Sequence, residues 1–122
     1  MKKKILVVDD EPDVLSVLEK RLSEAGYSVV TVLGGREAFN KIKEEMPDLI
    51  LLDIVMPGID GVEIGKSLKN DPKTKDIPVI FLTCLFTKKD EEAMGRSAGG
   101  NIFIAKPYDP QELLKEIEKH LR

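Results

Sequence analysis

Leu49-Ile50-Leu51-Leu52-Asp53 is a run of four apolar residues that ends in one carboxylate. Turn-forming residues follow at once, in the stretch Met56-Pro57-Gly58-Ile59-Asp60-Gly61. A short apolar run next to turn residues is typical of a strand that is buried on both faces, as strands of parallel sheets are. Asp53 would then stand at the carboxyl end of such a strand, where open parallel sheets place their ligand sites.

The rest of the chain alternates short apolar runs with stretches of helical periodicity. Further strands are predicted at Ile5–Val8, Ser28–Val32, Pro78–Thr83 and Ile102–Ala105. Apolar residues at helical spacing predict helices near 12–25, 38–46, 61–68, 88–97 and 113–121, of which 88–97 is poorly amphipathic. Five strands that alternate with five helices indicate the α/β class with a parallel sheet.

The apolar content of the strands predicts their order in the sheet. Ile5–Val8 and Leu49–Asp53 are the most apolar runs and belong in the middle, whereas Ser28–Val32 is partly alternating and reads as an edge strand. Right-handed crossovers then give a doubly wound, flavodoxin-like sheet of order 2-1-3-4-5 with five helices on two faces. The first and fifth helices would cover one face. The chain reverses direction between strands one and three, which predicts a ligand crevice there.

Length and composition limit the possible classes of protein. The chain has 122 residues and 42% hydrophobic residues, which suits one domain over residues 1–122. A formal net charge of −3 argues against direct nucleic-acid binding. Cys84 is the single cysteine, and the apolar run after Lys2-Lys3-Lys4 is too short for a signal peptide or membrane span. We therefore expect a cytoplasmic, soluble protein.

Polar residues stand at the carboxyl ends of four predicted strands. Asp9 and Asp10 follow the first strand, Asp53 ends the third, Thr83 ends the fourth, and Lys106 follows the fifth. Neighbouring strands lie about 4.8 Å apart, so these groups should meet at one sheet edge. Three carboxylates this close repel one another, and a hard cation such as Mg²⁺ relieves that repulsion. The hydroxyl and the ammonium group could neutralise a phosphoryl group held on a carboxylate.

Each of these residues has an ordinary structural explanation when it is taken alone. Asp9 and Asp10 could cap the following helix, because helix N-termini favour aspartate. Asp53 could be a turn residue, Thr83 an ordinary hydroxyl at a strand end, and Lys106 a solvated surface charge. Phe103, an aromatic residue of the fifth predicted strand, could be a simple core side chain. Only the joint placement of five polar groups at one sheet edge favours a common site.

With these motifs in this order, the chain resembles bacterial two-component response-regulator receiver domains, the CheY-like domains. The resemblance rests on Val7-Val8-Asp9-Asp10-Glu11, Asp53 to Gly61, Thr83 and Lys106-Pro107, and it covers nearly the whole chain. It implies a phosphorylation-controlled signalling switch, and not an enzyme that turns over a free substrate. Asp53 would accept a phosphoryl group from a histidine kinase or a phosphotransfer protein and would lose it slowly.

The resemblance also implies a magnesium site. Asp10 and Asp53 would bind Mg²⁺ directly, Asp9 would bind it through water, and the backbone carbonyl of Val55 would complete the protein ligands.

A switch is implied at the neighbouring strand ends. Thr83 and Lys106 would contact the phosphoryl oxygens, and Phe103 would swing inward as Thr83 moves. An unknown output partner or a second copy of the chain would bind the face made by the fourth helix, fifth strand and fifth helix. We expect a monomer or a phosphorylation-dependent dimer, with no membrane contact.

Two other functions are disfavoured by the residues. Haloacid-dehalogenase-like enzymes place a second aspartate two residues after their nucleophile, and that position here is Val55. A flavin or nucleotide binder on a flavodoxin-like fold would need a glycine-rich phosphate loop after the first strand. The acidic run Asp9-Asp10-Glu11 stands there instead and would repel a phosphate.

Overall fold

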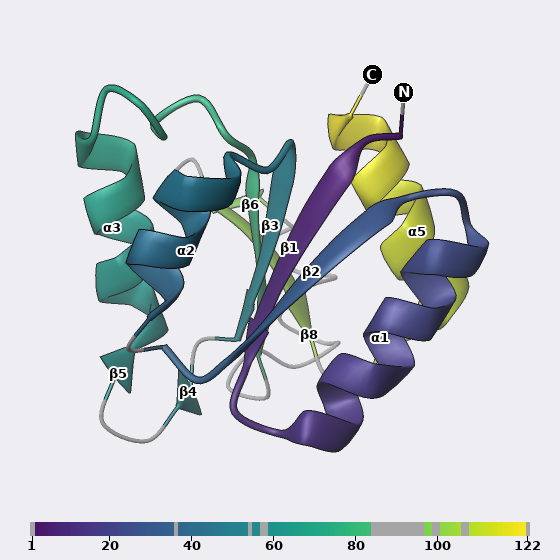
Figure 1. Ribbon diagram of the computed structural model, residues 1–122. Helices are drawn as coiled ribbons and strands as arrows, with labels where there is room; N and C mark the ends of the chain where they lie inside the picture. Colours follow the sequence, from purple (N-terminus) through teal and green to yellow (C-terminus); the bar gives the residue numbers. More distant parts are fainter. Residues whose placement is uncertain are drawn as a thin grey trace.

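A parallel sheet forms the middle of the molecule (Figure 1). Every neighbouring pair among its five main strands is parallel. Side by side, these strands are β2 (Ser28–Leu33), β1 (Lys4–Asp9), β3 (Leu49–Asp53), β6 (Val79–Thr83) and β8 (Asn101–Ala105). The computed structural model describes residues 2–35, 37–53, 55–56, 59–83, 97–98, 101–105 and 108–121.

The predicted strand order 2-1-3-4-5 is confirmed, with β6 and β8 as the fourth and fifth strands. The two apolar runs lie at the centre, and residues 5–8 and 49–52 are at most 1% exposed. The edge strand β2 is only partly buried, as its alternating sequence predicted. Apolar runs therefore mark strands with a neighbour on each side and a helix layer on each face.

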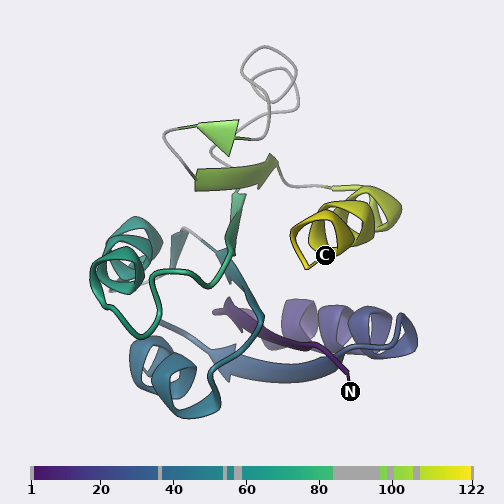
Figure 2. The same ribbon diagram turned by 90° about the horizontal axis from the view of Figure 1, so that it is seen from above.

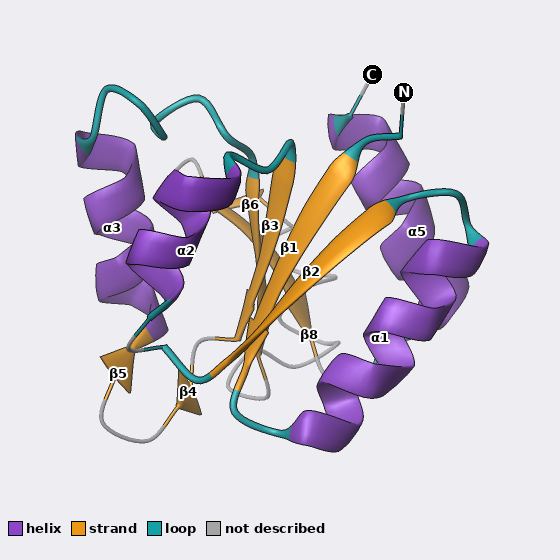
Figure 3. Ribbon diagram, viewed as in Figure 1, coloured by secondary structure: helices purple, strands orange, loops and turns teal. Residues whose placement is uncertain are grey.

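Four helices of the described chain cover the sheet (Figure 3). They are α1 (Pro12–Glu24), α2 (Ala38–Glu45), α3 (Gly61–Asn70) and α5 (Pro110–His120). Seen from above, α1 and α5 lie on one face and α2 and α3 on the other, as predicted (Figure 2). The fourth predicted helix falls outside the described residues, apart from its last residue. In the described part of the chain, no helix has the length and apolar content of a membrane span.

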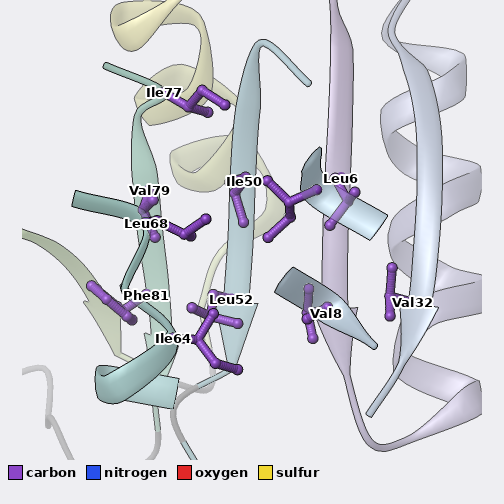
Figure 4. Close-up of a cluster of buried hydrophobic side chains, with 12 residues drawn as sticks. Leu6, Val8, Val32, Ile50, Leu52, Ile64, Leu68, Ile77, Val79 and Phe81 are labelled. Carbon is purple, nitrogen blue, oxygen red and sulfur yellow. The ribbon is translucent and has the colours of Figure 1, made fainter. Parts of the chain in front are cut away.

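Alternating residues of the central strands supply two separate core clusters. On β1, Leu6 and Val8 pack with the α2 and α3 side chains, whereas Ile5 and Val7 pack with those of α1 and α5. Figure 4 shows the first cluster, in which Ile64 and Leu68 of α3 lie against β3 and β6. The second cluster is closed by Leu15, Leu18, Leu22, Leu113 and Ile117. The period-two alternation of the strands thus divides one apolar run between two helix layers.

The structure corrects the sequence reading at two short segments. Ser97 was expected to end a helix and Ala98 to break it, but Ser97–Ala98 forms β7, which pairs antiparallel with β8. The turn expected at 56–61 contains a two-stranded hairpin of β4 (Val55–Met56) and β5 (Ile59–Asp60). Two residues are too few to show a periodicity in the sequence. Such short strands form where a neighbouring backbone offers hydrogen bonds.

Both described ends of the chain lie at one end of the molecule. In Figure 1 the N and C labels stand together at the top, whereas the β4–β5 hairpin and the loop from β1 to α1 lie at the bottom. Asp9 and Asp53 are the last residues of β1 and β3, so they belong to the bottom edge. The acidic edge of the sheet and the chain ends are therefore separated by the length of the central strands.

Candidate functional site

Three carboxylates meet at the carboxyl edge of the two central strands. The parallel register pairs Val8 with Leu52, so the next residues along, Asp9 and Asp53, come side by side. Asp10 follows directly on β1. One carboxylate oxygen from each of Asp9, Asp10 and Asp53 lies within 4.8 Å of the others. The structure thus brings together the three acids that the sequence predicted as a cluster.

The backbone around Asp9 fixes the position of this carboxylate. The Glu11 amide donates to Asp9 Oδ1 at 3.0 Å, and the Gly34 amide donates to the Asp9 carbonyl at 2.7 Å. Glu11 is the N-cap residue of α1, and its own side chain makes no capping hydrogen bond. A local turn contact therefore accounts for one oxygen of Asp9, whereas helix capping does not, and neither explains the approach of Asp10 and Asp53 to it.

Burial gives the cluster its chemical character. Asp9 is 1% exposed and Asp53 is 6% exposed, whereas Asp10 is partly exposed. Carboxylates placed this close together in a poorly solvated edge repel one another strongly. Oxygen donors of this kind, with one side open to solvent, match the preference of Mg²⁺ for a few carboxylates plus waters. The donor set therefore fits the magnesium ion that the sequence predicted.

The described residues support the other predicted ligands and contacts only in part. Val55 begins β4, two residues after Asp53, and its proposed carbonyl ligation remains a prediction. Thr83 ends β6, directly after the Leu82 that pairs with Asp53, so its backbone reaches the acidic edge. The Thr83 side chain and the whole of Lys106 lie outside the described residues. Ala105, which precedes Lys106, pairs with Thr83.

Phe103 has a partner that the sequence reading missed. It is partly buried and stacks on Phe81, with the ring centroids 5.2 Å apart and the ring planes at 21°. The strand register places the two residues opposite each other, so an aligned sheet would have revealed the pair. Gly65 of α3 lies against the tip of the Phe81 ring. No sequence pattern marks that glycine, because the contact exists only once the helix is packed on the sheet.

Comparison with known proteins identifies the family. Residues 5–118 match the model of the response regulator receiver domain. Curated relatives include the probable transcriptional regulator ycf27 of Guillardia theta, which is 41% identical over 99% of this chain. Another is PhoP of Bacillus subtilis, a transcriptional regulatory protein of alkaline phosphatase synthesis, which is 38% identical over 100% of this chain. The chain spans about half the length of these relatives, 46% of ycf27 and 50% of PhoP.

Solved structures of other proteins resemble this chain over 99% of its length. CheY4, a chemotaxis response regulator of Vibrio cholerae, has 31% identity and a TM-score of 0.83, with 99% of this chain and 100% of that chain covered. The receiver domain of the histidine kinase PA1611 from Pseudomonas aeruginosa has 27% identity and a TM-score of 0.83, with coverage of 99% and 98%, and carries magnesium in its active-site cleft. Sequence family, fold and acidic edge all agree, and the chain belongs to the response-regulator receiver domains.

Proposed function

We propose that Asp53 is the phosphoacceptor of this receiver domain and that its phosphorylation switches a signalling surface. The observation that carries the proposal is the cluster of Asp9, Asp10 and Asp53, whose carboxylate oxygens lie within 4.8 Å of one another. Asp53 ends a strand whose five residues are all buried, so its backbone is held rigidly. Such a placement suits a nucleophile that must meet a phosphoryl donor from solution.

The transfer forms one bond and breaks another. A carboxylate oxygen of Asp53 attacks the phosphorus of a phosphohistidine, and the phosphorus–nitrogen bond breaks. The electron pair of that bond leaves with the imidazole, which takes up a proton, and Asp53 becomes an acyl phosphate. A small donor such as acetyl phosphate would react in the same way, with cleavage of a phosphorus–oxygen bond. The donor protein would be a sensor histidine kinase or a phosphotransfer protein.

The acids around Asp53 would hold Mg²⁺. Asp10 and Asp53 would bind it directly, Asp9 through water, and the Val55 carbonyl would be the remaining protein ligand. When bound, the ion supplies positive charge that offsets the carboxylates and the phosphoryl oxygens. The magnesium in the active-site cleft of the PA1611 receiver domain supports this assignment.

The neighbouring strands would transmit the effect of phosphorylation from Asp53 to the surface of the domain. The phosphoryl group adds roughly −1.5 to −2 charge at neutral pH. Thr83 and Lys106 would contact its oxygens, and the movement of Thr83 would draw Phe103 inward. The surface that responds would be the one made by the segment 88–97, β8 and α5. An output partner or a second copy of the chain would bind there, in the cytoplasm.

The domain would act as a switch and not as a turnover enzyme. A haloacid-dehalogenase-like hydrolase needs an acid two residues after its nucleophile, and Val55 stands at that position. The net charge of −3 does not favour direct contact with nucleic acid by this domain. In transcriptional regulators such as PhoP, this chain matches only half of the protein. We assign any DNA binding by such regulators to the other half.

Acetyl phosphate tests the phosphoacceptor directly. In the presence of Mg²⁺ the wild-type protein should gain the mass of one phosphoryl group, and Asp53→Asn should gain none. Asp13→Asn, an exposed aspartate in the first turn of α1, is the matched control and should gain as the wild type does. Absence of a mass gain on folded wild-type protein, or an equal gain on Asp53→Asn, would overturn the proposal.

A further inference from the structure

Phe81, Phe103 and Gly65 form a continuous contact, which we call the aromatic stack. Phe81 on β6 is 2% exposed and belongs to the core cluster between the sheet and α3. One face of its ring stacks on Phe103 of β8, with centroids 5.2 Å apart. Phe103 itself is only partly buried and packs against the edge of the same cluster. The buried Phe81 ring thus supports the partly buried ring of Phe103.

Gly65 makes room for the tip of the Phe81 ring. A Cβ atom built on Gly65 would lie 2.6 Å from Cζ of Phe81 and 3.2 Å from its Cε1. Atoms of these types do not approach so closely, so any larger residue at position 65 would force the ring to tilt or slide. Figure 4 shows the Phe81 side chain at the end of β6 nearest to Ile64, the neighbour of Gly65. The position of the ring is therefore set by α3 on one side and by Phe103 on another.

Phe81 and α3, the helix that carries Gly65, are both connected to the acidic edge by short stretches of chain. Phe81 lies two residues before Thr83, and its neighbour Leu82 pairs with Asp53. α3 begins at Gly61, directly after the hairpin that follows Asp53. A change at Asp53 that moves Thr83 or the hairpin would thus reach the aromatic stack from two directions.

We propose that Phe81 and Gly65 are positioning residues for Phe103. The Gly65 notch holds the Phe81 ring where its face favours the partly buried position of Phe103 over an outward one. This inference rests on the proposed function, in which phosphorylation of Asp53 favours the inward position of Phe103. We take the stacked, partly buried position in this structure as that inward position. Phe81 would then stabilise the phosphorylated state without touching the phosphoryl group.

Beryllofluoride in the presence of Mg²⁺ provides the probe, because it imitates a phosphoryl group on a carboxylate without covalent turnover. Stacked aromatic pairs bias an equilibrium by about 2- to 10-fold beyond the burial of their area. Phe81→Leu should therefore weaken beryllofluoride binding by about 2- to 10-fold. Gly65→Ala should also weaken it, because the added methyl group displaces the same ring. Amide NMR titration gives the dissociation constant and confirms the fold of each variant.

A double-mutant cycle separates positioning from general loss of stability. In the Phe103→Leu background, both Phe81→Leu and Gly65→Ala should leave the dissociation constant unchanged, because the ring that they position is gone. Ile42→Val removes one buried methyl group from the same core cluster and is the matched control, with no change in binding. A merely structural role would lower the urea midpoint of every variant and leave binding alone.

The outcomes for the two proposals are distinct. If folded wild-type protein does not bind beryllofluoride with Mg²⁺, the proposed function fails. If the wild type binds but Phe81→Leu and Gly65→Ala bind equally well, the positioning role is overturned. It is also overturned if their effects persist unchanged in the Phe103→Leu background.

Discussion

Asp9 combines a structural and an electrostatic role in one residue. Its side chain accepts the Glu11 amide at 3.0 Å and its carbonyl accepts the Gly34 amide at 2.7 Å, so it ties β1 to the start of α1 and the end of β2. It is also one of three acids within 4.8 Å. Asp10 shares the second role, and in the structure it is the more exposed of the two. Asp10 is therefore the better place to test the electrostatics alone.

Without a divalent cation, Asp10→Asn should raise the free energy of unfolding by roughly 1 kcal/mol, because it removes one charge from a repelling cluster. With Mg²⁺ at ten times its dissociation constant, the wild type should gain about 1.4 kcal/mol, and the variant clearly less. Thermal midpoints with EDTA and with Mg²⁺ measure both effects. Asp13→Asn should leave the magnesium response intact. A midpoint of the wild type that ignores Mg²⁺ would mean that the acids do not form a metal site.

At the scale of elements, two helices are each followed by a residue with positive φ, but the two residues differ in type. Gly26 follows Ala25, the C-cap of α1, and has φ +99°. Met46 is itself the C-cap of α2 and has φ 46°. Glycine adopts positive φ without cost, whereas an L side chain pays roughly 1–2 kcal/mol there. Met46 is also 48% exposed, so its side chain recovers little of that cost by burial.

Met46→Gly should therefore stabilise the protein by about 0.5–1 kcal/mol, after allowing for the greater freedom of glycine in the unfolded chain. Gly26→Ala should destabilise it by about 1–2 kcal/mol, although the space around Gly26 is open, because the strain lies in the backbone. Urea midpoints at constant slope measure both changes. Met46→Ala keeps the strain and should show no gain. A stabilising Gly26→Ala would contradict the argument.

The sequence predicts those elements whose own residues show a pattern, such as an apolar run or a glycine that ends a helix. The apolar runs at 5–8 and 49–52 predicted the central strands, and Gly26 predicted the end of the first helix. The hairpin at 55–60 and the strand Ser97–Ala98 were not predictable, because two residues have no periodicity and their pairing depends on a neighbouring backbone. The left-handed conformation of Met46 was equally hidden, since methionine rarely adopts it.

The candidate site was predictable for a different reason. Asp9, Asp10 and Asp53 could be placed together because they stand at the carboxyl ends of two neighbouring strands. The order of those strands followed from their apolar content and from right-handed crossovers. The stack of Phe81 on Phe103 and the notch at Gly65 depend on how side chains fill the space between sheet and helix. Side-chain packing of that kind is a property of the folded core and is not encoded in spacing along the chain.

On the scale of the whole molecule, one sheet carries two helix layers. Leu18 of α1 is 1% exposed in one core cluster, and Ile42 of α2 is fully buried in the other. Because alternate residues of β1 and β3 belong to both clusters, neither layer can lose its packing without exposing the strands that support the other. The molecule should therefore unfold as a single unit.

Leu18→Ala and Ile42→Ala should each lower the free energy of unfolding by about 2–5 kcal/mol. Both should keep one cooperative transition with an unchanged urea slope, because the sheet is common to the two layers. Circular dichroism and amide NMR, followed through the same urea series, would compare the two layers. Ser16→Ala, at an exposed position of α1, is the control and should have little effect. Two separate transitions in either variant would show that the layers unfold independently.

The separation of the acidic edge from the chain ends has a practical consequence. A tether attached near Lys2 or Leu121 leaves the far end of the molecule facing away from the support (Figure 1). Receiver domains immobilised through either end on a biosensor chip would all present Asp53 and its neighbouring acids to the flowing solution. Kinases, phosphotransfer proteins and metal ions could then be compared on one oriented surface, without the attachment chemistry obstructing the edge where they act.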